Sequence, residues 1–324
     1  MVGPGDDAAV VRPERGALEV LTTDAQVEGV HFDRRFVPPD AIGHRALAVN
    51  LSDVAAMGAA PRAALLSLLL PDALELDVID GMLDGMLALA ARHRVAVVGG
   101  NITRSPGPLV IDVTVTGSVR PRKVLTRSGA RPGDVVYVTG SIGDALVGLR
   151  SLQGGPQAPP LRTVVATASE SYVGADLQVR PHSCEERYLR PEPRLRVGAL
   201  LGRNRAASSC VDLSDGLADG VRQIAQASGV GITIDGAAVP VSDAARRWHD
   251  ERGQDAVMAS IAGGDDYELL FTVRPAQRGR LRGVQKVLGP VPITRVGVVT
   301  KDSRLLVRTA DGDRDMPSGF EHFR

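Results

Sequence analysis

The apolar positions of the chain follow two periods, one typical of strands and one typical of helices. In residues 109–119, Ile111, Val113 and Val115 fall on one face and polar side chains on the other, which predicts a half-buried strand. Residues 77–92 instead repeat apolar side chains at helical spacing. The chain therefore contains both kinds of element.

The same reading extends along the chain. A helix is predicted over residues 40–57, where Asp40 is a candidate N-cap. Further strands are predicted at residues 20–23, 63–70, 95–98, 135–139, 232–234 and 269–273. Strands and helices alternate without a strict βαβ rhythm, which favours an α+β fold over a doubly wound sheet.

The length of 324 residues predicts two domains. We place them at residues 1–128 and 129–324, because residues 120–132 have the character of a crossing between α/β regions. Residues 154–186 have Pro-rich turns and weak periodicity, which predicts an inserted surface loop in the second domain.

The composition is that of an ordinary globular protein, with 44% hydrophobic and 23% charged residues and a formal net charge of zero. No dense basic stripe is visible, which argues against a nucleic-acid partner. The longest apolar runs are far short of a membrane span, so a cytoplasmic protein is expected. Cys184 and Cys210 have no metal-ligand spacing and are expected to be a loop thiol and a buried thiol.

Candidate chemistry comes from six segments that set a carboxylate or amide beside Gly, Ser or Thr. They are residues 5–7, 22–24, 50–53, 99–101, 212–215 and 263–266. Oxygen ligands of this kind suit Mg²⁺, which usually meets protein through a few carboxylates plus substrate phosphates. The segments therefore predict a polyphosphate site that is neutralised by metal ions.

The lysine content supports metal ions rather than side-chain cations. The only lysines are Lys123, Lys286 and Lys301. No P-loop motif G-x-x-x-x-G-K-[ST] is present, which excludes that class of nucleotide site. Neither an H-R-D loop nor D-F-G is present, so a protein kinase is excluded as well.

At this point, several of the candidate residues have more than one possible role. Asp53 lies among apolar neighbours, where a buried carboxylate needs a partner that a shared metal would supply. Asp215 is a candidate helix cap as well as a candidate metal ligand. His31 can be structural, and Arg127 is either an exposed linker residue or a fork for phosphate oxygens.

Taken together, the motifs resemble the thiamine-monophosphate kinases. The resemblance is carried by GDDAAV at 5–10, TTD at 22–24, EGVHF at 28–32, AVNLSD at 48–53, LTRSG at 125–129, LRP at 189–191, DLSDGL at 212–217 and GGDDYEL at 263–269. It covers most of the chain. This family belongs to the superfamily of aminoimidazole ribonucleotide synthetase and selenophosphate synthetase, whose ATP sites lack a P-loop.

The resemblance implies a two-domain α+β fold that pairs through its N-terminal domains in a homodimer. It implies transfer of the ATP γ-phosphoryl group onto thiamine monophosphate, giving thiamine diphosphate. It also implies several Mg²⁺ ions and allows K⁺ as a further cation. Neither a nucleic acid nor a membrane is among the expected partners.

Site residues also follow from the resemblance, position by position. The expected metal ligands are Asp7, Thr22, Thr23, Asp24, Asp53, Asn101, Asp212 and Asp215. The expected ATP contacts are Gly100, Asn101, Arg127 and Ser214, and the expected thiamine contacts are His31, Asp265 and Phe320.

The sequence departs from the family at three of its motifs. Asn101 stands where Asp is common, Asp265 where Glu is common, and Pro317 where an aromatic residue often packs on the substrate, a role that Phe320 could take. Two other readings therefore stay open. One is a superfamily relative with another acceptor, and the other is a catalytically impaired nucleotide-binding homodimer.

Overall fold

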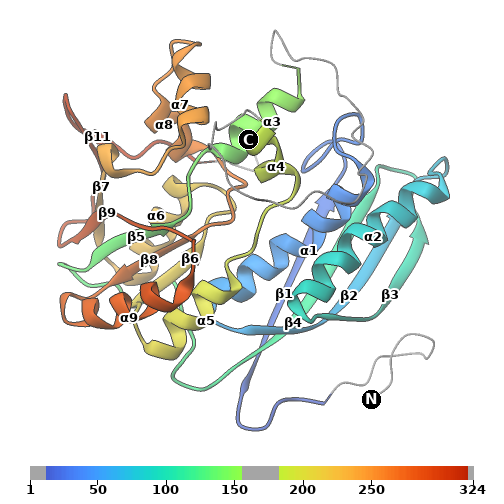
Figure 1. Cartoon of the computed structure of the whole chain (residues 1–324), viewed down its shortest axis with the longest axis horizontal. Coiled ribbons are helices and arrows are strands. Elements are labelled where there is room, and N and C mark those ends of the chain that lie inside the picture. The colour runs from blue at the N-terminus through green and yellow to red at the C-terminus, as the bar shows by residue number, and fades with distance from the viewer. Residues whose placement is uncertain (1–11, 155–181, 320–324) are drawn as a thin grey trace, which may run out of the picture.

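The computed structural model describes residues 12–154 and 182–319, which fold around two β-sheets (Figure 1). The four-stranded sheet has the order β1-β4-β2-β3, and the seven-stranded sheet has the order β11-β10-β7-β9-β5-β8-β6. The first sheet is built from β1 (Leu18–Val27), β2 (Ala60–Leu70), β3 (Ala96–Arg104) and β4 (Val110–Val119). The second is built from β5 (Val135–Thr139), β6 (Ser209–Asp212), β7 (Gly231–Asp235), β8 (Leu269–Val273), β9 (Ile293–Thr300), β10 (Leu305–Thr309) and β11 (Gly312–Asp315).

Most neighbouring strands are antiparallel, as an α+β fold requires. Among the strands of the described residues, only the pairs β2–β3 and β7–β10 run parallel. The predicted boundary at residue 128 falls in the connection between β4 and β5. Each strand expected from the apolar pattern is found, and residues 111, 113 and 115 of β4 are buried as their alternation predicts.

Helices α1 (Pro39–Ala56) and α2 (Leu76–His93) cover one face of the first sheet (Figure 1). The remaining helices belong with the second sheet or between the domains. They are α3 (Asp144–Leu152), α4 (His182–Leu189), α5 (Leu195–Asn204), α6 (Leu217–Ser228), α7 (Asp243–Asp250), α8 (Ala256–Ala262) and α9 (Arg278–Leu288), with 3₁₀ turns η1 (Gly236–Ala238) and η2 (Pro275–Gln277). No helix within residues 12–154 and 182–319 is long and apolar enough to cross a membrane.

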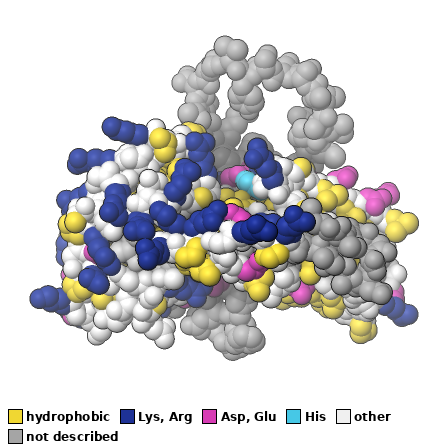
Figure 2. Space-filling model, turned by 90° about the horizontal axis from the view of Figure 1, so that it is seen from below, with side chains coloured by type: hydrophobic (Ala, Val, Ile, Leu, Met, Phe, Trp, Pro, Cys, Tyr) yellow, Lys and Arg dark blue, Asp and Glu magenta, His cyan; other side chains and the backbone are white. Residues whose placement is uncertain are grey.

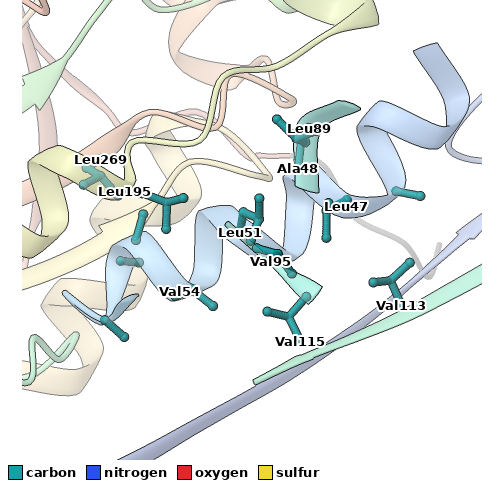
Figure 3. Close-up of a cluster of buried hydrophobic side chains, with 14 of the residues drawn as sticks. Leu47, Ala48, Leu51, Val54, Leu89, Val95, Val113, Val115, Leu195 and Leu269 are labelled. Atoms are coloured by element: carbon teal, nitrogen blue, oxygen red, sulfur yellow. The ribbon is translucent and has the colours of Figure 1, made fainter. Parts of the chain in front are cut away.

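Helix α1 is the central element of the molecule, because it is buried on nearly every side. It contacts β1, β4 and α2 of its own domain, and also α5 and β6 on the other side. Figure 3 shows Leu47, Leu51 and Val54 of this helix within the shared apolar cluster, with Val113 of β4 on one side and Leu195 of α5 on the other. One hydrophobic core therefore joins the two domains around α1.

Glycines allow the helices around α1 to approach backbone to backbone. A Cβ placed on Gly85 of α2 would lie 1.9 Å from the Asp40 carbonyl oxygen, and one on Gly43 would lie 1.7 Å from that of Met82. Across the domain boundary, a Cβ on Gly198 of α5 would lie 1.9 Å from the Ala55 carbonyl oxygen. Any larger residue would therefore push α1 away from its neighbours.

Three local predictions are corrected at the ends of elements. Helix α1 has Pro38 as its N-cap, and Asp40 lies in the first turn without capping it. Strand β3 continues to Arg104, so residues 99–101 lie inside a strand rather than after one. Helix α6 begins after Gly216, whose φ of +93° suits glycine, and Asp215 is therefore not the cap.

The predicted loop at residues 154–186 extends too far. Residues 155–181 lie outside the described residues, but α4 already begins at His182. Cys184, expected as a loop thiol, is in this helix and buried, as is Cys210 in β6. The start of α4 was not predicted, because this helix has only 8 residues and follows a segment with weak periodicity.

The charged side chains are not evenly spread over the surface. Helices α5 and α9 pack together, and neither contains an Asp or Glu. Figure 2 looks at the molecule from below and shows Lys and Arg side chains gathered across that face. The exposed cations of the two helices are Arg196, Arg203, Arg278, Arg280, Arg282 and Lys286. The sequence alone does not reveal this basic surface, because its arginines and lysine come from two helices that are distant in sequence.

We expect Gly85→Ala to destabilise the protein, because the added Cβ must separate α1 from α2. The free energy of unfolding should fall by about 1–3 kcal/mol, the usual cost of overpacking. Gly283→Ala is the control, since Gly283 is exposed in α9 with nothing near its Cβ position. It should raise stability by about 0.5–1 kcal/mol through helix propensity. Equal effects in urea unfolding would contradict the proposed close approach.

Candidate active site

A cleft of about 880 Å³ lies between the domains and collects most of the predicted site residues that the structure describes. The first domain contributes β1, α1 and the loop after β1. The second contributes α3, α4, the end of β6 and the segments that follow β6 and α8. The predicted residues that line the cleft are Asp24, His31, Asp53, Asp212, Ser214, Asp215 and Asp265. Segments far apart in sequence therefore meet in one cavity.

Three carboxylates enter the cleft from three different elements. Asp24 lies on β1, Asp53 near the end of α1, and Asp212 at the end of β6. Two hydroxyl groups hold them in place. The Thr22 hydroxyl donates to Asp53 Oδ2 at 2.5 Å, and the buried Ser52 hydroxyl donates to Asp212 Oδ2 at 2.8 Å.

Burial and mutual repulsion disfavour the charged forms of these carboxylates. Burial raises the pKa of Asp24 to about 6, and the charges of Asp53, Asp112 and Asp215 add to that rise. Burial likewise raises the pKa of Asp212 to about 7, helped by Asp53 and opposed by the Ser52 hydrogen bond. Carboxylates with such pKa values are candidates for a functional site.

Arg127 is the nearby cation that partly offsets this negative charge. Burial raises the pKa of Asp53, while the hydrogen bond from Thr22 and the charge of Arg127 lower it. The charge of Arg127 also lowers the pKa of Asp212. Arg127 is exposed, as the linker interpretation expects, but its charge acts on two carboxylates of the cleft.

The donor set suits a hard divalent cation that also binds substrate oxygens. Within the described ranges, no three His, Cys, Asp or Glu side chains converge tightly enough to enclose an ion by themselves. Mg²⁺ does not require that, because it keeps several waters and is commonly held by one or two carboxylates together with phosphates. The repelling carboxylates therefore fit Mg²⁺ bound jointly with a phosphate ligand.

At the other end of the cleft, a fully buried arginine organises the wall. Arg45 of α1 is 1% exposed and donates to Asp265 Oδ1 at 2.8 Å. Its guanidinium lies 4.2 Å from the centre of the Tyr188 ring and also donates to the Tyr188 carbonyl oxygen. Tyr267 donates its hydroxyl to the same Asp265 oxygen at 3.1 Å. Arg45 thus ties together α1, α4 and the loop before β8.

His31 is held in the loop that faces this wall. Its Nδ1 accepts the backbone N–H of Val27 at 3.0 Å, and its carbonyl oxygen accepts the Tyr188 hydroxyl at 3.2 Å. His31 therefore connects the loop both to β1 and to α4. His31 and Asp265 line the same cleft.

Glu268 anchors the second-domain side of the cleft. It is fully buried and accepts hydrogen bonds from Arg194 Nε and the Thr139 hydroxyl, each at 2.6 Å. Burial would raise its pKa, but the hydrogen bond and charge of Arg194, with the charge of Arg187, hold that pKa below its ordinary value. These ionic contacts fix α4 and α5 to the sheet beside the cleft.

Three predicted site residues lie away from the cleft. Thr23 points to the opposite face of β1 from Asp24, where its hydroxyl donates to Asp112 at 3.0 Å. Gly100 and Asn101 lie on β3, which β2 and β4 separate from β1, and Asn101 is exposed. This protomer alone therefore does not bring Thr23, Gly100 and Asn101 to the carboxylates. The predicted residues Asp7 and Phe320 lie outside the described residues.

Two contributors were missed from the sequence. Asp112 was interpreted only as the polar side of a strand, although its charge contributes to the raised pKa of Asp24. Arg45 carries a signal that could have been used, because it is a cation inside a helix of small apolar residues. A buried cation needs an anionic partner, but the sequence does not say that Asp265 is that partner.

Family models match both parts of the chain. The AIR synthase related protein, N-terminal domain, matches residues 5–119, and the AIR synthase related protein, C-terminal domain, matches residues 131–309. The matched ranges contain the first and nearly all of the second β-sheet. The two-domain α+β fold expected from the resemblance is thereby confirmed.

Relatives of known name match along almost the whole chain. The thiamine-monophosphate kinase of Escherichia coli K12 is 40% identical over 99% of this chain and 92% of its own length. That of Bacillus subtilis is 35% identical over 100% of this chain and 94% of its own length.

Solved structures agree with these relatives. The thiamine-monophosphate kinase of Stenotrophomonas maltophilia has a TM-score of 0.81 at 38% identity, covering 95% of this chain and 90% of its own. The complex of AaThiL with AMPPCP and TMP has a TM-score of 0.79 at 30% identity, covering 96% and 89%. The hydrogenase maturation protein HypE, at 22% identity and a TM-score of 0.76, shares the fold alone. The chain belongs to the thiamine-monophosphate kinase family.

Proposed function

We propose that this protein phosphorylates thiamine monophosphate to thiamine diphosphate, with ATP as the phosphoryl donor and Mg²⁺ as the cation. The observation that carries the proposal is the meeting of Asp24, Asp53 and Asp212 in one interdomain cleft of a chain from this family. The related complex with AMPPCP and TMP, which holds a non-hydrolysable ATP analogue, supports the same pair of ligands.

The chemistry demands positioning and charge neutralisation more than covalent help. A phosphate oxygen of the acceptor attacks the γ-phosphorus of ATP in line, and ADP leaves. No enzyme nucleophile is required. Mg²⁺ bound to both substrates would offset the repulsion between the two anions and the charge that develops during transfer. Asp24, Asp53 and Asp212 would hold it, with Asp215 lining the same cavity.

The remaining residues of the cleft would orient the substrates. Arg127 offers a guanidinium fork for ATP phosphate oxygens next to Asp53 and Asp212. Ser214 lies on the same wall, and its carbonyl oxygen accepts the Asp265 N–H at 2.7 Å. His31 and Asp265 would contact the thiamine part of the acceptor, with Asp265 held by Arg45.

We also propose a homodimer formed by the first sheet. Its inner face packs against α1 and α2, while the outer face carries Leu21 and Leu65, which are 69% and 42% exposed. Thr23 and Asn101 lie on this outer face as well, opposite the face of the sheet that packs on α1 and α2. A second copy packed on this face would cover the leucines and give Thr23 and Asn101 a neighbour from another chain.

Turnover and its loss on mutation test the activity. Purified protein with ATP, Mg²⁺ and thiamine monophosphate should form thiamine diphosphate, and EDTA should abolish the product. Asp24→Asn or Asp215→Asn should lower kcat by about 100-fold or more, because charge stabilisation of the transition state is lost. Asp84→Asn, an exposed change in α2, is the matched control and should have normal turnover. Near-normal activity in both cleft variants would contradict the metal-binding assignment.

The raised pKa values predict how stability without metal depends on pH. The folded protein binds protons on Asp24 and Asp212 more tightly than the unfolded chain does. The free energy of unfolding therefore falls as the pH rises from 3.8, the ordinary pKa of both groups, through their folded-state pKa values of about 6 for Asp24 and about 7 for Asp212. The Tm measured in EDTA should therefore fall less for Asp212→Asn than for the unmodified protein between about pH 5 and pH 8. Added Mg²⁺ should raise the Tm of the unmodified protein more at the higher pH. Parallel pH profiles for the two proteins would contradict the raised pKa of Asp212.

Light scattering coupled to gel filtration tests the dimer. Leu65→Glu should convert a dimer into a monomer, because it places a charge on the face that the partner covers. Leu87→Glu is the control, since Leu87 is comparably exposed on α2, at 49%, away from this face. A monomeric unmodified protein, or a Leu65→Glu variant that stays dimeric, would argue against this interface.

A further inference from the structure

Gln26 is a buried amide that has no hydrogen-bond partner in the described part of the chain. It lies on β1, is only 5% exposed, and lines the cleft. Its Oε1 is buried without a hydrogen-bond partner among residues 12–154 and 182–319. Buried polar atoms are nearly always paired, so an unpaired one in a cleft is a candidate ligand contact.

The position of Gln26 does not fit an ordinary core residue. Strand alternation puts it on the same face of β1 as Thr22 and Asp24. Across the sheet it is opposite Ile111, which is fully buried. An apolar side chain of similar size would fill this place without leaving a polar atom unpaired. Packing in the first domain therefore does not explain why an amide is present at this position.

Gln26 also lies between the two ends of the cleft. Asp24, on the metal-binding side, is two residues earlier, which corresponds to about 6.5 Å along a strand. In the other direction, the next residue, Val27, donates its N–H to His31 at the thiamine side. Gln26 therefore lies beside the place where the phosphate end of an acceptor would sit if its organic part contacts His31.

We infer that the Gln26 amide binds the phosphate monoester of the acceptor, an inference that rests on the function proposed above. The NH₂ group, which carries two donor hydrogens, donates to phosphate oxygens of the acceptor. As a neutral group beside Asp24, it adds no further negative charge against the phosphate.

The test compares two ligands on two proteins. Gln26→Leu removes the amide at nearly constant volume. Its KM for thiamine monophosphate should rise about tenfold or more, the usual effect of losing a hydrogen bond to a charged group, while the KM for ATP stays unchanged. The inhibition constant of thiamine, which has no phosphate, should be the same for both proteins. An equal loss for both ligands would overturn the phosphate assignment and place the contact on the organic part.

Stability separates a ligand contact from a structural role. Because the amide is unpaired in the free protein, Gln26→Leu should leave the Tm unchanged or raise it. A clear fall in Tm with an unchanged KM would show that Gln26 is structural and would overturn the inference. Gln277→Leu is the matched control, since its Oε1 is also unpaired but it lies outside the cleft lining, in η2. Neither KM should change in this control.

The design keeps the two proposals apart. If the unmodified protein forms no thiamine diphosphate, the proposed function fails before Gln26 is considered. If the unmodified protein is active and Gln26→Leu retains its KM for thiamine monophosphate, only the inference about Gln26 fails.

Discussion

The partial burial of Asp24, Asp53 and Asp212 close to one another is the constraint on which the active site depends. Burial first, and then the charges of neighbouring carboxylates, raise the pKa values of Asp24 and Asp212, so the charged forms are unfavourable without a cation. The fold keeps them together through Thr22 and Ser52, which donate hydrogen bonds to two of the three. A divalent cation bound here would neutralise the carboxylates and could bind phosphate oxygens at the same time.

Helix α1 determines the geometry of that site, because it belongs to both walls of the cleft. It brings Asp53 and Ser52 to the carboxylates near its C-terminal end and Arg45 to the opposite wall. Its burial between the first sheet and α5 leaves little freedom to shift. The separation of Asp53 from Arg45, and with it that of the proposed metal-binding and thiamine-binding ends of the cleft, is therefore set by one rigid helix.

Local patterns predicted much of the fold, and partners distant in sequence limited the rest. The alternation of Ile111 and Val113 was sufficient for β4, since burial of one face imposes a period of two. The same period separates Thr23 from Asp24, so their opposite faces could have been foreseen. By contrast, the pairing of Arg45 with Asp265 depends on how the two domains pack, which no local window contains. The same limit applies to the basic face of α5 and α9.

The most direct test of the central claim is to locate the cations in crystals grown with Mn²⁺, AMPPCP and thiamine monophosphate. The anomalous signal of Mn²⁺ would identify the ion without reference to the protein. The account predicts anomalous peaks in contact with carboxylate oxygens of Asp24, Asp53 and Asp212 and with phosphate oxygens of the ligands. Peaks elsewhere, or ligands bound in this cleft with no ion beside these three residues, would contradict it.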